Sequence, residues 1–453
     1  MSNEKTKGVD ILLGNPERAI LKLSLPMMLG MFIQALYNLV DGFWIAGLGE
    51  KQLAAIGIFF PLFIVVIALG AGLGVGGGSA VSRKLGSGDK IEADRYAAQT
   101  ISILLITGIA TSVITLPLLK GIFNLVSKDT ETIGYAVEYG TILIAGSIFM
   151  LFTHGANALL RAEGDSKKAM IAMLIGAVLN LVLDPVFIYT LGMGIKGAAA
   201  ATVVSMGVSA FLTGYWLFVG DRIYLNIRLS GFKPDLNAIR EIMSVGIPSA
   251  VSQISMSVSL FMINMIASSV AGTKGVAVFT ASWRVFTLGT IPLIGISTGV
   301  VSVTGAAFGA CNRDKLKRAY TFAIKTGMAA GGFFALLIGF FSDKIAFLFT
   351  YSEGTSSLAE PISACLTIAV VMLPFVPMGM FTSAMFRGIG KGYQSLWATV
   401  FRACLMQVLG AWYFGVYFGS IYGVALGLTL GNIAAVFIVS IWGRRYITNL
   451  PFE

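Results

Sequence analysis

Apolar segments long enough to cross a membrane recur along nearly the whole chain. Of its 453 residues, 56% are hydrophobic and 12% are charged, about half the charged fraction of a soluble domain. An apolar helix needs about 20 residues to cross the hydrocarbon layer. Twelve segments of that length occur, at 17–45, 52–80, 92–119, 132–155, 168–191, 196–219, 241–271, 275–304, 319–342, 357–384, 392–418 and 421–443. Because they are continuously apolar rather than alternating, they predict helices and not the strands of a barrel.

The basic residues indicate how these helices are oriented. The net charge is +10, but Lys and Arg do not form one patch, which argues against a nucleic-acid partner. Most of them fall on alternate loops and therefore on one side of the membrane, and such an excess marks the cytoplasmic side. We therefore expect a multi-pass protein of the cell membrane with both termini in the cytoplasm. The three cysteines have no metal-ligand spacing, and we interpret them as packing residues.

The chain also repeats itself. A shift of about 222 residues places Pro26 on Pro248, and shifts of 223 to 226 place Arg95 on Arg318, Arg161 on Arg387 and Gly197 on Gly423. Six helices followed by six more of the same orientation are typical of transporters with parallel repeats. We expect a six-helix N-terminal lobe at 1–219, a linker at 220–240 and a six-helix C-terminal lobe at 241–453.

Two carboxylates, Asp41 and Asp184, lie deep inside the apolar segments, and both belong to the N-terminal half. On the first helix Gln34, Asn38 and Asp41 share one face, and Tyr37 lies beside them. An ionised Asp in mid-membrane costs roughly 3 kcal/mol on insertion scales, so it persists only with a proton, a cation or a partner to neutralise it. Proton or cation exchange is therefore the expected chemistry of this face.

The fifth helix carries the second acid in a similar setting. Asn180 and Asp184 are four residues apart, and Pro185 frees a backbone carbonyl one turn earlier. The sixth helix begins with small residues that allow close approach, and Thr202 on it adds a hydroxyl. Carboxylate, amide, carbonyl and hydroxyl oxygens suit a hard cation or a shared proton.

Structural alternatives exist for each of these residues. Asp184 could satisfy the kink at Pro185, Asp41 could be an interfacial acid, and Thr202 could bond its own helix. Asn157 and His154, the one histidine, could be buried polar contacts rather than parts of a cavity or proton path.

Flexible residues suggest a binding surface and a hinge. Methionines adapt to ligands of different shape, although ordinary helix packing explains them equally well. Pro26 should kink the first helix and provide a hinge. The methionines that we expect to face the midline include Met27, Met31, Met173 and Met256.

Several motifs together resemble the multidrug and toxic compound extrusion (MATE) family. They are Pro26 with Asp41, the stretch from Asn180 to Pro185, the stretch from Gly197 to Thr202, and the loop at 85–89 with its partner at 308–310. The likeness covers nearly the full chain and is strongest to the DinF-like prokaryotic branch, in particular to archaeal members. It implies twelve helices in two six-helix lobes that form a V and are related by pseudo-two-fold symmetry.

The resemblance also implies a function. Asp41, Asn180, Asp184 and Thr202 would form a proton or Na⁺ site, with Tyr37 and Asn157 in its network. The activity would be export of drugs and organic cations, coupled to H⁺ and/or Na⁺. Apart from the resemblance, the sequence supports no cofactor beyond a bound ion, and we expect a monomer because one chain already contains both lobes. The stretch 256–265 lacks the acid that another branch of the family places in the C-terminal lobe.

Other functions are less well supported. A flippase for lipid-linked oligosaccharides or peptidoglycan precursors shares the broader fold but should display several arginines for pyrophosphate. The predicted spans contain only Arg284, Lys325 and Arg402 as basic residues. An intramembrane transferase needs clustered acids or histidines, and a channel needs a filter or rings of charge; the sequence shows neither pattern.

Overall fold

The computed structural model describes residues 6–220, 223–228, 233–350 and 353–452, and in this part of the chain the secondary structure is helical, without strands. The expected all-α architecture is confirmed. The helices divide into two compact units, an N-terminal unit of Met1–Gly14 and Leu25–Ala250 and a C-terminal unit of Asn15–Ser24 and Val251–Glu453. Ten residues of the C-terminal unit, Asn15–Ser24, therefore come from near the beginning of the chain.

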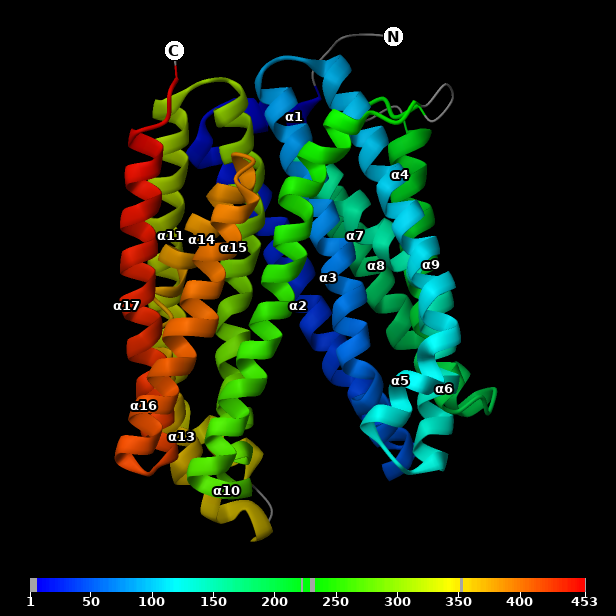
Figure 1. Cartoon of the computed structure of the whole chain (residues 1–453), viewed down its shortest axis with the longest axis vertical. Helices are drawn as coiled ribbons and strands as arrows, with labels where there is room; N and C mark the ends of the chain where they lie inside the picture. Colours follow the sequence, from blue (N-terminus) through cyan, green and yellow to red (C-terminus); the bar gives the residue numbers. More distant parts are fainter. Residues whose placement is uncertain (1–5, 221–222, 229–232, 351–352, 453) are drawn as a thin grey trace. The chain divides into compact units, whose positions relative to one another are not determined.

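The helices of the N-terminal unit come from the first half of the chain and are coloured blue to green in Figure 1. Asp89, Asp129 and Asp165 cap α4, α6 and α8, because their side chains accept hydrogen bonds from backbone N–H groups in the first turn of each helix. Within the unit α3 packs against α4 and α7, and α8 packs against α9. The helices are α1 (Lys7–Leu13), α2 (Pro16–Ala46), α3 (Glu50–Gly86), α4 (Lys90–Thr115), α5 (Leu119–Val126), α6 (Thr130–Ala145), α7 (Ser147–Ala162), α8 (Ser166–Pro185) and α9 (Ile195–Phe218), with a 3-10 turn η1 (Leu116–Leu118) and a π-helix η2 (Val186–Thr190). The first turns of α2, up to Ser24, belong to the C-terminal unit.

The C-terminal unit holds the remaining helices and most of α10, which begins in the N-terminal unit. Asn312 and Ser420 cap α11 and α17 in the same way. Here α17 packs against α13, α14 and α16. The elements are α10 (Leu236–Gly309), α11 (Arg313–Phe340), α12 (Ser342–Phe349), η3 (Glu353–Leu358), α13 (Ala359–Val370), α14 (Val376–Gly388), α15 (Gly392–Val400), the π-helix η4 (Phe401–Gln407), α16 (Val408–Phe418) and α17 (Ile421–Thr448).

The twelve predicted spans lie on these helices or on consecutive pairs of them, apart from short breaks. Among the described residues, nine helices are long and apolar enough to cross a membrane, and α6 with α7 makes a tenth span, bent by 48°. The 74-residue α10 is too long for one crossing and is interrupted at Gly272, whose φ of 61° is not helical, so it accounts for two predicted spans. The predicted span 357–384 is divided into α13 and α14 by a turn.

The same close helix contact occurs once in each unit. A Cβ atom at Gly76 of α3 would lie 2.4 Å from the carbonyl oxygen of Ile242. A Cβ atom at Gly299 would lie 2.8 Å from the Ser24 hydroxyl and 3.3 Å from the carbonyl oxygen of Ile20. These positions match under the shift of 222 to 223 residues, so the sequence repeat is also a repeat of tertiary contacts.

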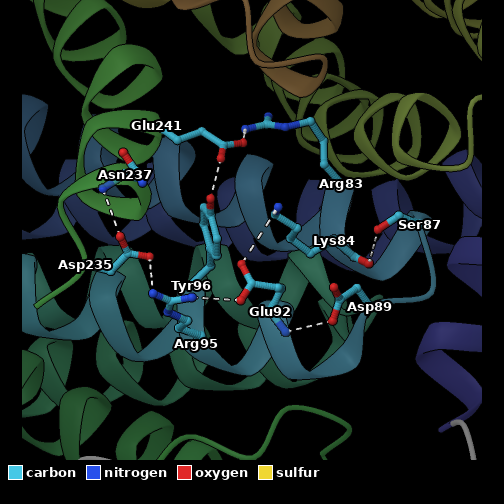
Figure 2. A network of polar contacts seen from close by, with 10 residues as sticks. All are labelled: Arg83, Lys84, Ser87, Asp89, Glu92, Arg95, Tyr96, Asp235, Asn237 and Glu241. Atoms are coloured by element: carbon cyan, nitrogen blue, oxygen red, sulfur yellow. Dashed lines mark hydrogen bonds and ion pairs between the residues drawn. The ribbon is translucent and has the colours of Figure 1, made fainter. Parts of the chain in front are cut away.

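The connection between the repeats is fastened to the N-terminal unit by polar contacts (Figure 2). Arg83 forms an ion pair with Glu241, which also accepts a hydrogen bond from Tyr96. Arg95 pairs with Asp235 at 2.6 Å. These bonds join α3 and α4 to the residues that begin α10, so the start of α10 is held as part of the N-terminal unit.

A buried carboxylate provides a further attachment. Glu163, directly after α7, is 1% exposed and accepts hydrogen bonds from the backbone N–H groups of Tyr224 and Leu225, both at 3.1 Å. Asp94 accepts another from the N–H of Asn226. The described residues of the linker are therefore bonded to α4 and to the end of α7.

The cysteines only partly agree with their interpretation as packing residues. Cys365 is buried and Cys404 is half-buried, but Cys311 is exposed. The packing interpretation is therefore wrong for Cys311, which lies in the turn before α11 at a φ of 51°. The apolar sequence around Cys311 gave no sign that this cysteine would lie in a turn.

Candidate functional site

Asn180 and Asp184 form the centre of a buried polar site in the N-terminal unit. Because they are one turn apart on α8, Asn180 Nδ2 donates to Asp184 Oδ1 at 3.3 Å. Asp184 is fully buried and Asn180 is 2% exposed. The π-helix η2 follows Pro185 directly, as expected where a proline removes a backbone donor.

Thr202 belongs to the same cluster. Small residues at the start of α9 allow close packing on α8, and Asn180 Nδ2 lies 3.5 Å from Thr202 Oγ1. The Thr202 hydroxyl donates to the carbonyl of Ala198 at 3.1 Å, so its lone pairs face the Asn180 amide. Thr202 therefore makes both contacts: the bond to its own helix, which was the alternative role, and the contact with Asn180.

Asp41 completes a pair of carboxyl groups with Asp184. The two side chains lie within hydrogen-bonding reach of one another. Two ionised carboxylates cannot donate, so this contact becomes a hydrogen bond only when one of them carries a proton. Without that proton Asp184 Oδ2 is buried and has no donor.

Contacts between α2 and α8 hold the two acids near each other. A Cβ atom at Gly30 of α2 would lie 3.5 Å from Met170 Cγ and 3.6 Å from Met173 Sδ. Farther along, the Tyr189 hydroxyl donates to the carbonyl of Trp44 at 2.6 Å. Met173 therefore lies at the contact of these helices.

Two tyrosines lie near the carboxyl pair. Tyr37 was expected there from its position on α2, and the structure places it close to Asp41 and Asp184. Tyr139 of α6 is also near both acids and is packed edge-on against Phe59 at 5.3 Å between ring centroids. Sequence reasoning missed Tyr139, because one tyrosine in an apolar span carries no signal of its tertiary neighbours.

The other expected site residues are more dispersed. Asn157 is buried with an unpartnered Oδ1, Gln34 and Met31 are half-buried, and Asn38 is exposed on α2. Met27 is packed in the core at 1% exposure. Met256 is exposed and belongs to the C-terminal unit, while Pro26 lies within α2.

Two acceptor oxygens without hydrogen-bond donors indicate what the cluster can bind. Asp184 Oδ2 and Asn180 Oδ1 are both buried acceptors without a donor. Each could accept a proton-bearing group or coordinate a hard cation together with Asp41 and Thr202. Among the described residues, no group of three or more His, Cys, Asp or Glu side chains could hold a metal ion, so a Na⁺ site here would combine two carboxylates with neutral oxygens.

Apolar spans around a buried polar cluster define a polytopic membrane protein of the transporter class, because polar groups in membrane helices mark ion and substrate paths. The model of the MatE family matches residues 26–186 and 248–413, so the chain belongs to the MATE family of transporters and is not an enzyme. The family expected from the motifs is confirmed.

Relatives and solved structures agree with this assignment. The multidrug export protein MepA of Staphylococcus haemolyticus is 28% identical over 302 residues, which are 66% of each chain and thus just under two thirds of that protein. A crystal structure of a MATE protein in complex with MaL6 is 44% identical, has a TM-score of 0.96, and is matched over 98% of this chain and 99% of its own. A transporter of the MOP superfamily from Pyrococcus furiosus, also 44% identical, has a TM-score of 0.95 over the same shares; it is described as having a binding pocket of reversed polarity that suggests a different function.

Proposed function

We propose that this chain is a multidrug efflux antiporter that exports organic, often cationic, compounds in exchange for H⁺ and/or Na⁺. The observation that carries the proposal is the half-buried Asp41 next to the buried Asp184 and Asn180, where two acceptor oxygens have no donor among the described residues. The similarity of this chain to a multidrug export protein supports the drug-export activity. Because the P. furiosus relative is described as having a different function, substrates of both charges should be tested.

The proposed coupling follows from the cost of buried charge. With one proton or one Na⁺ bound, the repulsion between the two carboxylates is relieved; without it, the pair favours an organic cation. A ligand shifts a conformational equilibrium only by its difference in affinity for the two states. Exchange results when only the loaded states interconvert by alternating access, with Pro26 as the point where α2 bends.

We further propose that the protein acts as a monomer in the cell membrane, with both termini in the cytoplasm. The basic residues on alternate loops support this orientation. Addition of a small tag to either terminus, followed by protease protection in sealed cells, would test it. Digestion of either tag from outside would contradict the orientation.

The decisive experiment is efflux of ethidium from proteoliposomes under a proton gradient or a Na⁺ gradient, each imposed separately. We expect efflux driven by at least one gradient, and a loss of about tenfold or more in Asp184→Asn and Asp41→Asn because the exchangeable charge is removed. Glu138→Gln is the matched control, since it removes an exposed carboxylate of the same unit that pairs with Lys196.

Unchanged gradient-driven efflux in both Asp variants would overturn the coupling role of the pair. No efflux under either gradient would contradict antiport and favour the flippase for lipid-linked precursors. Norfloxacin should be tested beside ethidium, because it carries a carboxylate as well as an amine.

A further inference from the structure

Arg402 is a buried arginine in the middle of a predicted membrane span of the C-terminal unit. It lies on η4, eleven residues into the span 392–418, or about 15 Å from its start at 1.5 Å per residue. The side chain is 8% exposed. Of the three basic residues inside the predicted spans, Arg284 and Lys325 are exposed, so Arg402 is the buried one.

Its hydrogen bonds leave a surplus of donors. Within the described residues, Arg402 makes one hydrogen bond, from Nη1 to Asn432 Oδ1 at 3.3 Å. Gln407 Nε2 donates to the same oxygen at 2.7 Å. Since arginine only donates, the amide of Asn432 must direct its oxygen toward the guanidinium and its nitrogen away from it.

Two buried N–H groups therefore have no acceptor within the described part of the chain, Arg402 Nε and Asn432 Nδ2. Arg402 has no ion pair with any described carboxylate, and no Asp or Glu lies deeper than the first four residues of a predicted span in this half. Both a buried charge and buried unpaired donors are costly. An anion is the one kind of ligand that compensates the charge and the donors together.

The position of this cluster corresponds to that of the acidic cluster. A shift of 226 residues places the start of α8 on the start of α15 and the start of α9 on the start of α17. The first helix pair carries Asp184, Asn180 and Thr202, whereas the second carries Arg402, Gln407 and Asn432. Each pair also contains a π-helix, η2 or η4, a distortion that often occurs at functional sites.

The backbone of α14 closes one side of the cluster. A Cβ atom at Gly379 would lie 2.9 Å from Arg402 Cδ and 3.4 Å from Nε, so a glycine is needed for the guanidinium to pass. We propose that Arg402, Asn432 and Gln407 form a binding site for one small monovalent anion in the C-terminal unit. The anion is a halide such as chloride or the carboxylate of a transported molecule; the site is independent of the coupling role proposed for Asp41 and Asp184.

The test is thermal unfolding of the purified full chain in detergent, titrated with sodium chloride against sodium methanesulfonate, a bulkier anion without a carboxylate, at constant Na⁺ concentration and ionic strength. Parallel titrations use sodium acetate and norfloxacin. We expect a saturable rise of the unfolding temperature with chloride or with a carboxylate. A response to chloride identifies an inorganic ion, and a response only to carboxylates identifies the substrate as the source.

The control variant is Arg284→Gln, which removes an exposed arginine of the same unit and should keep the anion response. Arg402→Gln should abolish it or weaken the apparent affinity by about tenfold or more. Because Arg402→Gln could fail to fold, Asn432→Asp is the second variant. It places a negative charge beside Arg402, and we expect it to raise the unfolding temperature without added anion and to remove the anion response.

If Arg402 and Asn432 had only a structural role, substituting them would not remove a response to added anion. A response that persists in Asn432→Asp or Arg402→Gln would overturn the proposal, as would the lack of any saturable response in the unsubstituted protein. A crystal soaked in bromide gives a direct check, since an anomalous peak should lie beside Arg402 Nε and Asn432 Nδ2. These readouts need no transport and so do not depend on the antiport proposal.

Discussion

Arg83 Nη2 lies 2.8 Å from Oε1 of Glu241, and this ion pair joins α3 to the beginning of α10 within the N-terminal unit (Figure 2). Arg83 is buried, and its guanidinium also donates to the Ser79 hydroxyl. The pair therefore attaches a segment of the second repeat to helices of the first. This attachment fixes the start of α10 to the helices of the N-terminal unit.

We expect Glu241→Gln to lower the free energy of unfolding by about 2 kcal/mol, because it removes a carboxylate from direct contact with the buried Arg83 charge; the half-exposed position of Glu241 reduces the cost below that of a fully buried pair. Thermal unfolding in detergent measures the change. Glu138→Gln breaks an exposed ion pair and should cost about 0.5 kcal/mol or less. Equal effects of the two variants would show that the Arg83 pair has no special role.

The close contact at Gly76 should tolerate no side chain. In Gly76→Ala the new Cβ atom would meet the backbone at Ile242, and we expect a loss of about 2 kcal/mol from overpacking. Gly299→Ala should cost less, because its nearest neighbour is the movable Ser24 hydroxyl. Gly57→Ala, with open space around it, is the helical control and should be neutral or stabilising. The yield of folded protein and its unfolding temperature distinguish these outcomes.

The stability of the protein should depend on pH through Glu163. Burial raises the pKa of this carboxyl to about 8, while the backbone N–H groups of Leu225 and Tyr224 and the charge of Lys168 act in the opposite direction. The folded protein therefore keeps a proton that the unfolded chain, with an ordinary Glu pKa, has released. The stability that this proton provides is complete below about pH 4.5 and is lost as the pH rises through about 8.

Glu163→Gln tests this dependence, because it keeps an acceptor oxygen for the linker but cannot ionise. Unfolding temperatures from pH 5 to pH 9 should fall less steeply in Glu163→Gln than in the unsubstituted protein. Asp165→Asn, two residues away at the cap of α8, controls for a general change of charge. Parallel curves for the Gln variant and the unsubstituted protein would exclude Glu163 as the titrating group.

Substitutions in the turns before α4 and α11 should change the stability in opposite directions. Gly88 and Cys311 match under the shift of 223 residues, and both have positive φ, 81° and 51°. A residue with a Cβ atom is strained in this conformation by roughly 1–2 kcal/mol. We expect Cys311→Gly to stabilise the protein by about 1 kcal/mol and Gly88→Ala, which meets no other atom, to destabilise it by a similar amount. Changes of the same sign at both positions would contradict a cause in backbone strain.

Part of the candidate site was predictable because its residues are neighbours along one helix. Asn180 and Asp184 share a face of α8 at a spacing of four, so their contact follows from helix geometry. The closeness of Asp41 to Asp184 required α2 to pack on α8, which hydropathy does not encode. Tyr139 and the buried donors around Arg402 were not foreseen for the same reason, since each depends on which helices become neighbours.

The sequence by itself determined the membrane class, the helices and the family. In hydrocarbon every backbone polar group must be satisfied within its own segment, so length and apolarity predict most spans, although not the turn that divides 357–384 or the bend between α6 and α7. The tertiary structure alone decided that residues 15–24 belong to the C-terminal unit, that Glu163 holds the linker, and that Arg402 meets Asn432. These features arise from packing between segments far apart in the chain, and such contacts depend on the shape and spacing of several helices at once.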